Sequence, residues 1–110
     1  MEKIQTFEQF WPFYLSQHQS AVNRYLHVFG LLMAIPVIYC AFAFDLLWLL
    51  GLPICGYGFA WIGHFIIEQN RPATFTYPVW SFMADFKMCY YILTGKIDHE
   101  IMALNQQVNG

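Results

Sequence analysis

The chain has 110 residues, of which 58% are hydrophobic, 20% aromatic and only 11% charged, with a formal net charge of -2. This composition excludes a disordered chain, which is poor in apolar residues and rich in charge, and five Lys and Arg residues argue against a nucleic-acid partner. A water-soluble domain of this length has too much surface to hide so many apolar side chains. We therefore expect a single domain over residues 1–110 that uses a lipid bilayer as part of its solvent.

The N-terminal segment, residues 5–20, mixes aromatic side chains with polar ones. Thr6 followed by Gln9 three positions later is typical of a helix start, and Pro12 is compatible with a first turn or a bend. Aromatic residues are enriched where a membrane meets water. We therefore predict an amphipathic helix that lies at a membrane surface.

Two uncharged runs follow, residues 28–44 and 46–63, and only Asp45 separates them. The first run together with the three residues before it reaches the ~20 residues that span a bilayer. Because almost nothing joins the two runs, we predict an antiparallel transmembrane hairpin that turns near Asp45, where this side chain caps the turn. Pro36 predicts a kink in the first span.

The last third of the chain is more polar. We predict a helix over residues 79–93 with Gly95 as its stop, and the sequence leaves open a third span, a re-entrant segment or an interfacial helix. Apolar residues at helical spacing in the tail from Lys96 to Gly110 predict a short surface helix. The expected fold class is an all-α integral membrane protein with an amphipathic N-terminal helix, a transmembrane hairpin and one or two further C-terminal helices.

The histidines are placed symmetrically about the predicted turn. His27 precedes Asp45 by 18 residues and His64 follows it by 19, so both lie about 27 Å from the turn at 1.5 Å per residue. His18 is nine residues before His27, which on one unbroken helix would place the two on opposite faces. We therefore predict a bend between them, with Ser20 or Asn23 capping the helix that follows.

Small residues line the faces that the two predicted spans present to each other. Gly30 is level with Ala60, and Ala34 is level with Gly56, while Gly63 continues the same face toward the histidines. Small residues let transmembrane helices approach closely. The hairpin is therefore predicted to pack tightly along its length and to open onto His27 and His64.

These histidines are candidate metal ligands. A lone histidine at a membrane boundary is usually only a satisfied polar group, but His18, His27 and His64 converge at one depth, and Glu68 shares a helix face with His64. Histidine with carboxylate suits Fe, Zn or Mn, and a site with open positions suits non-haem Fe(II). His99, in the polar tail, is interpreted as a surface residue.

Further polar residues surround this group. Asn23 and Glu68 are candidates to orient the imidazoles. Arg24 and Arg71 are interpreted as partners of lipid headgroups or of a substrate carboxylate. Asp85 and Lys87 are interpreted as a local surface pair, with a role of Asp85 at the site as the alternative. The candidates for positioning or substrate binding are Asn23, Arg24, Asn70, Arg71 and Asp85.

Three motifs together resemble one known family. They read His18-x4-Asn23-Arg24-x2-His27-x2-Gly30, then Gly63-His64-x3-Glu68-x-Asn70-x-Pro72-Ala73, then Tyr77-Pro78-x-Trp80-Ser81-x3-Asp85. Over residues 10–95 this pattern resembles the Mpo1-like family of small membrane proteins, formerly a domain of unknown function.

The resemblance implies an Fe(II)-dependent dioxygenase that carries out α-oxidation of 2-hydroxy fatty acids with O2, giving the acid one carbon shorter. It implies His18, His27 and His64 as iron ligands and a catalytic position for Glu68. A 2-hydroxy carboxylate could chelate such an iron and leave a position for O2.

The chain departs from the eukaryotic members, which resemble four-span proteins, and its short form resembles bacterial ones. We therefore expect the bacterial inner membrane, or the endoplasmic reticulum if the protein is eukaryotic. Lys3, Arg24, Arg71 and Lys87 lie at the open end of the hairpin, which the positive-inside rule places toward the cytoplasm.

Two other functions stay open at this point: another membrane metalloenzyme such as a zinc lipid hydrolase, or a non-enzymatic membrane protein that binds lipid or a partner. The sequence also leaves open a homo-oligomer.

Overall fold

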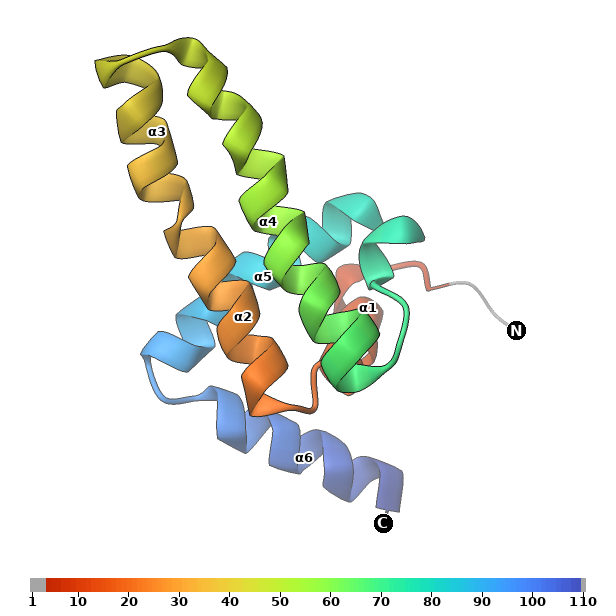
Figure 1. Cartoon of the computed structure of the whole chain (residues 1–110). Helices are drawn as coiled ribbons and strands as arrows, with labels where there is room; N and C mark the ends of the chain where they lie inside the picture. Colours follow the sequence, from red (N-terminus) through yellow and green to blue (C-terminus); the bar gives the residue numbers. More distant parts are fainter. Residues whose placement is uncertain (1–3, 110) are drawn as a thin grey trace.

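A computed structural model describes residues 4–109, and these form helices joined by short turns (Figure 1). In chain order the elements are α1 (Phe7–Ser16), α2 (Ala21–Leu32), α3 (Ala34–Ala43), the 3-10 helix η1 (Leu46–Leu50), α4 (Gly51–Trp61), the π-helix η2 (Ile62–Glu68), the 3-10 helix η3 (Ala73–Phe75), α5 (Pro78–Leu93) and α6 (Ile97–Asn109). Within this part of the chain there is no strand. The predicted all-helical class, with two further helices after the hairpin, is confirmed.

The predicted hairpin forms the long arm of the molecule. Two stretches, Ala21–Ala43 and Leu46–Glu68, are each 23 residues long and apolar enough to cross a membrane, and they run antiparallel in Figure 1. The first stretch is interrupted between α2 and α3, where Pro36 has no N–H to give and its ring crowds the carbonyl four residues earlier. At the tip, the Asp45 carboxylate accepts a hydrogen bond from Leu47 N at 2.9 Å, as expected of a cap.

Small residues bring the two arms of the hairpin together, but not at every predicted position. A Cβ on Gly30 would lie 2.8 Å from the Cys55 carbonyl oxygen, and one on Gly63 would lie 1.8 Å from Asn23 Oδ1. Nothing lies within 4 Å of a Cβ built on Gly56. The predicted close packing at Gly56 is therefore wrong, because this residue faces a cavity instead of the opposite helix.

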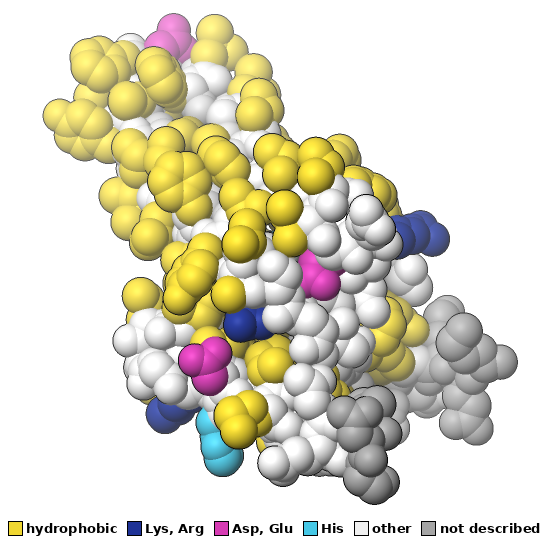
Figure 2. Space-filling view, turned by 60° about the horizontal axis from the view of Figure 1, so that its bottom comes forward, with side chains coloured by type: hydrophobic (Ala, Val, Ile, Leu, Met, Phe, Trp, Pro, Cys, Tyr) yellow, Lys and Arg dark blue, Asp and Glu magenta, His cyan; other side chains and the backbone are white. Residues whose placement is uncertain are grey.

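On the face seen in Figure 2, hydrophobic side chains cover most of the hairpin, with one acidic side chain at its tip, whereas the other charged side chains lie on the rest of the molecule. The exposed apolar side chains run along both arms and include Ile35 at 67%, Phe42 at 78% and Ile54 at 71% exposure. Soluble monomers rarely expose contiguous apolar surface of this kind, and such surface marks contact with a membrane or a partner.

The hydrophobic core lies at the open end of the hairpin, where α1 packs against α5 and α6. Its largest fully buried side chains include Phe10, Tyr14 and Met88, and Trp11 donates a hydrogen bond to Glu100 at 3.0 Å. The expectation that the aromatic face of α1 lies on a membrane is therefore wrong. The apolar faces of α5 and α6 cover this face, which buries the rings within the protein.

Helix α5 passes behind α2 and α4, across the hairpin (Figure 1). It has 16 residues, a length of about 24 Å, which is shorter than the ~30 Å hydrocarbon core of a bilayer. The predicted stop is confirmed, since the chain leaves the helix at Gly95 with φ of 77°, a conformation that favours glycine. The length argues against the third-span alternative.

Candidate metal centre

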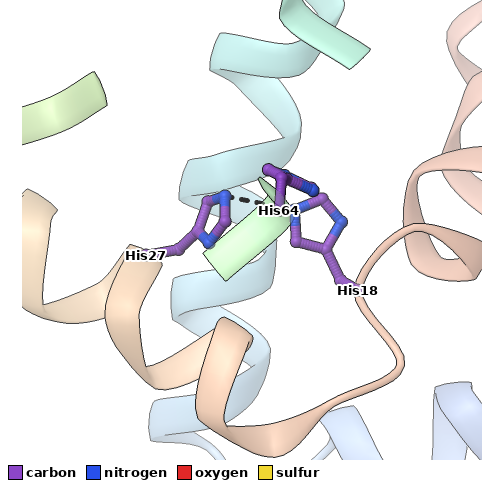
Figure 3. A group of neighbouring side chains, drawn as sticks. All are labelled: His18, His27 and His64. Atoms are coloured by element: carbon purple, nitrogen blue, oxygen red, sulfur yellow. Dashed lines mark hydrogen bonds between the residues drawn. The ribbon is translucent and has the colours of Figure 1, made fainter. Parts of the chain in front are cut away.

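His18, His27 and His64 meet at the open end of the hairpin (Figure 3). His18 lies in the turn between α1 and α2, His27 in α2 and His64 in η2. The ring centroids are 4.6 Å apart for His18 and His27, 4.5 Å for His18 and His64, and 5.0 Å for His27 and His64. All three are buried, and one ring nitrogen of each lies within 4.8 Å of the others. The predicted bend and the predicted levelling of His27 with His64 are confirmed. Ser20 occupies the N-cap position of α2, but its side chain makes no capping hydrogen bond, so the predicted side-chain cap is wrong.

The hydrogen bonds of the rings define which nitrogen carries the proton. His18 Nδ1 lies 2.6 Å from the Tyr14 carbonyl oxygen, and His27 Nδ1 lies 2.9 Å from the Asn23 carbonyl oxygen. A carbonyl oxygen can only accept, so both Nδ1 atoms carry the proton. For these two rings Nε2 is therefore an unprotonated acceptor.

His64 follows the same pattern through a side chain. Its Nδ1 lies 2.7 Å from Asn70 Oδ1, and Asn70 Nδ2 donates to the Gln17 carbonyl oxygen at 3.1 Å. This second bond fixes the orientation of the amide, so that its oxygen faces the ring. His64 Nε2 is therefore also free of a proton.

This arrangement suits a cation between the rings. His18 Nε2 and His27 Nε2 lie 3.2 Å apart, and with both protons on Nδ1 two lone pairs face each other with no hydrogen between them. Burial, reinforced by the neighbouring His27 and His64, lowers the pKa of His18 well below its ordinary value, so this ring stays neutral. Three neutral imidazoles are a donor set that transition metals bind, so the residues present fit such a metal.

Several polar side chains hold the turn that carries His18. Arg24 Nη1 donates to the carbonyl oxygens of His18 and Gln19, both at 2.8 Å, and Glu68 accepts from Ser20 N at 2.5 Å. Arg24 is only 7% exposed, so the expected contact with a lipid headgroup is wrong. Glu68 lies outside the group of three possible ligands, and its observed contact positions the turn.

The π-helical turn of η2 shapes the His64 side of the site. The segment ends at Gln69, whose φ of 56° is left-handed, and the chain then folds back so that Asn70 N donates to the His64 carbonyl oxygen at 2.8 Å. Single π-helical turns are frequent at functional sites. Helical periodicity could not have identified Asn70 as the partner of His64, because the reversal at Gln69 breaks that periodicity.

The remaining candidates lie in three different settings. Arg71 is exposed, with its guanidinium 5.3 Å from the centroid of the Phe75 ring. Lys87 lies 4.3 Å above the Trp11 ring, whereas Asp85 accepts a hydrogen bond from the Tyr14 hydroxyl. The expected surface pair of Asp85 and Lys87 is therefore wrong. Burial raises the pKa of Asp85 to about 7.

A cavity of about 320 Å³ adjoins the histidines. Its lining combines the three rings and a few further polar side chains with a larger apolar part, which we call the apolar arm. The apolar arm is formed by Leu31, Leu52, Pro53, Gly56, Tyr57, Ala60, Trp61 and Phe82. The other polar lining residues are Tyr14, Thr74, Ser81 and Asp85. A concave, mostly apolar site with a few convergent polar groups is typical of small-molecule binding.

Fold and site together define a helical protein in which three buried histidines could hold a metal ion at the polar end of an apolar cavity. The chain belongs to the Mpo1-like family: the family model described as "2-hydroxy-palmitic acid dioxygenase Mpo1-like" matches residues 4–97. That description indicates dioxygenase activity, with which a metal at the three histidines is compatible. No curated protein and no solved structure matches the chain.

We expect Asn70→Ala to weaken metal binding about 10–100-fold, the range typical of partners that orient a ligating imidazole. The alanine removes the acceptor that holds the proton on His64 Nδ1 and also the donor to Gln17. Anaerobic titration with Fe(II) measures the change. Asn70→Asp keeps the acceptor oxygen and should bind metal more tightly than the alanine variant; equal affinities for both variants would contradict this role.

Proposed function

We propose that this protein is an Fe(II)-dependent dioxygenase of the membrane that shortens 2-hydroxy fatty acids by one carbon. The observation that carries the proposal is the convergence of one ring nitrogen from each of three buried histidines, whose Nδ1 atoms are held by hydrogen bonds, beside a mostly apolar cavity. The family description adds the substrate class, because it names 2-hydroxy-palmitic acid and a dioxygenase.

In this proposal His18, His27 and His64 hold the iron. Bound there, Fe(II) would supply activation of O2 and oxidation of the substrate. The atoms balance when a 2-hydroxy acid and O2 give the acid one carbon shorter, CO2 and water. Because the substrate supplies the electrons, the reaction needs no second organic reductant. The chain itself binds the acyl tail, orients the rings through their Nδ1 hydrogen bonds and keeps bulk water from the buried centre.

The proposal places the hairpin across a bilayer and the site at its boundary. Apolar side chains of α5 are exposed on the same part of the molecule as the site; they are Val79, Phe82, Met83, Phe86, Tyr90 and Leu93. A helix with such a stripe lies in the membrane interface, from which an acyl chain could enter the cavity. We propose the bacterial inner membrane, with the open end of the hairpin toward the cytoplasm; Lys3, one of the residues behind this orientation, lies outside the described part of the chain.

Turnover by the purified, iron-loaded protein tests the proposal. With O2 and 2-hydroxypalmitic acid, we expect release of the acid one carbon shorter. Absence of turnover with verified iron content, across several chain lengths, would contradict it. One equivalent of zinc together with O2-independent activity would instead support a zinc lipid hydrolase on the same scaffold.

The cavity also predicts a change in chain-length preference. Gly56 lines the apolar arm and has no atom within 4 Å of a built Cβ, so Gly56→Leu should fill the arm and shift the preferred 2-hydroxy acid toward shorter chains. Relative turnover on a series of chain lengths measures the shift. Gly58 has equally open surroundings in the same helix but does not line the cavity. Gly58→Leu should keep the wild-type profile, and an identical profile for both variants would refute the prediction.

A further inference from the structure

One wall of the cavity carries two polar side chains that form no hydrogen bond with the three histidines. Ser81 and Asp85 are four residues apart on α5, so both side chains project from the same face of that helix, and both line the cavity. Figure 3 shows α5 passing behind the histidines. The histidines come from the α1–α2 turn, α2 and η2, so the pair on α5 forms a separate wall.

The hydroxyl of Ser81 is buried without a partner. Ser81 is 5% exposed, and its Oγ makes no hydrogen bond to any residue between 4 and 109. Buried polar atoms in folded proteins almost always have a partner, so an exception calls for a physical reason. A polar group of a ligand in the cavity would supply the missing partner.

Asp85 is held in place by one oxygen only. Its Oδ1 accepts from the Tyr14 hydroxyl, and the Tyr14 ring stacks on the His18 ring with centroids 4.0 Å apart. Among the described residues, Asp85 Oδ2 accepts no hydrogen bond. Tyr14 is thus a positioning residue that fixes the carboxyl beside the histidines and leaves its second oxygen for a ligand.

We propose that Ser81 and Asp85 bind the polar head of the substrate, with Ser81 Oγ donating to a carboxylate oxygen and Asp85 Oδ2 accepting from the 2-hydroxyl. This inference rests on the proposed function, which supplies the 2-hydroxy acid. It gives the protein a way to select such acids. An acid without the hydroxyl would leave Asp85 Oδ2 unpaired next to the ligand, and buried polar groups without partners strongly disfavour such analogues.

Binding of two acids that differ only in the hydroxyl tests the inference. We would measure the affinities of 2-hydroxypalmitic acid and palmitic acid for the metal-loaded protein by calorimetry in detergent. The wild type should prefer the hydroxylated acid by about 10-fold or more, the value of one hydrogen bond to a charged group. Asp85→Leu should abolish this preference. Asp85→Asn should also reduce it, because its single amide oxygen accepts from the Tyr14 hydroxyl and its NH2 group, which can only donate, then faces the 2-hydroxyl.

Ser81 has its own expected result. Ser81→Ala should weaken the binding of both acids by about 10-fold, because both carry the carboxylate. Ser81→Thr keeps the hydroxyl and should bind both acids like the wild type. Ser16→Ala removes the same hydroxyl at an exposed position outside the cavity and should bind both acids like the wild type.

The inference is overturned if the preference survives in Asp85→Leu, or if Ser81→Ala binds both acids like the wild type. Loss of metal from either variant would also overturn it, because the pair would then support the metal centre and not the substrate. Turnover of 2-hydroxypalmitic acid is measured separately. A wild-type protein that binds the 2-hydroxy acid selectively but does not shorten it would contradict the proposed function and leave this binding site intact.

Discussion

Replacing His64 by alanine should remove bound metal and lower turnover of 2-hydroxypalmitic acid by more than about 100-fold, since even the loss of a group that only orients a ligand costs about 10–100-fold. The same result is expected for His27→Ala and for His18→Ala, because one ring nitrogen of each histidine belongs to the same close group and all three residues are buried. Metal content and turnover of the same purified samples measure the effect.

His99→Ala is the matched control for these variants. His99 is exposed on α6 and lies outside the group of three, so its removal should change neither metal content nor turnover. Wild-type metal content and activity in all three buried-histidine variants would contradict a metal centre at this place. The non-enzymatic alternative, in which the hairpin binds lipid or a partner, instead predicts no turnover by the wild type and unchanged lipid or partner binding in all three variants.

Among glycine-to-alanine substitutions, Gly63→Ala should be the most destabilising. It should lower the free energy of unfolding by about 1–3 kcal/mol, the range for overpacking a tight interior. The added Cβ would lie 1.8 Å from Asn23 Oδ1 and 2.7 Å from Asn23 Cγ. Asn23 is fully buried and has little room to move. Denaturant unfolding of the detergent-solubilised protein measures the loss.

The same substitution should also reach the metal centre. Asn23 supplies the carbonyl oxygen that accepts from His27 Nδ1, so displacement of Asn23 should reorient this ring and weaken metal binding. Gly58→Ala is the control, because nothing lies within 4 Å of its added Cβ. Alanine there should be neutral, or stabilising by up to about 1 kcal/mol from helix propensity. Equal stability of the two variants would show that the contact between Gly63 and Asn23 is not tight.

The hairpin and the end of α5 could be predicted because their signals are local. Uncharged runs of membrane-spanning length, the single charge at Asp45 and the helix stop at Gly95 each act within a few residues, through hydrophobic partition and backbone conformation. The levelling of His27 with His64 followed from the same source, since two helical arms of similar rise that share a turn bring residues at equal distances from that turn together.

The roles of the polar residues around the histidines could not be predicted in the same way. Asn70 reaches His64 only because Gln69 takes a left-handed conformation after the π-helical turn. Arg24 and Glu68 hold the α1–α2 turn through backbone groups of His18, Gln19 and Ser20. Such contacts with main-chain atoms leave no pattern in the side chains of the sequence.

The placement of α1 and α5 depended on tertiary packing. The aromatic face of α1 is equally suited to a membrane surface and to a protein core, because both are apolar, and only the presence of α5 and α6 decides between them. The same docking brings Tyr14 to Asp85 and Ser81 to the cavity. The sequence by itself determined a helical hairpin with three histidines at its open end, since these follow from hydrophobic runs and helical rise. Only the tertiary structure decided which polar groups surround them, because those contacts join segments whose relative position no local pattern encodes.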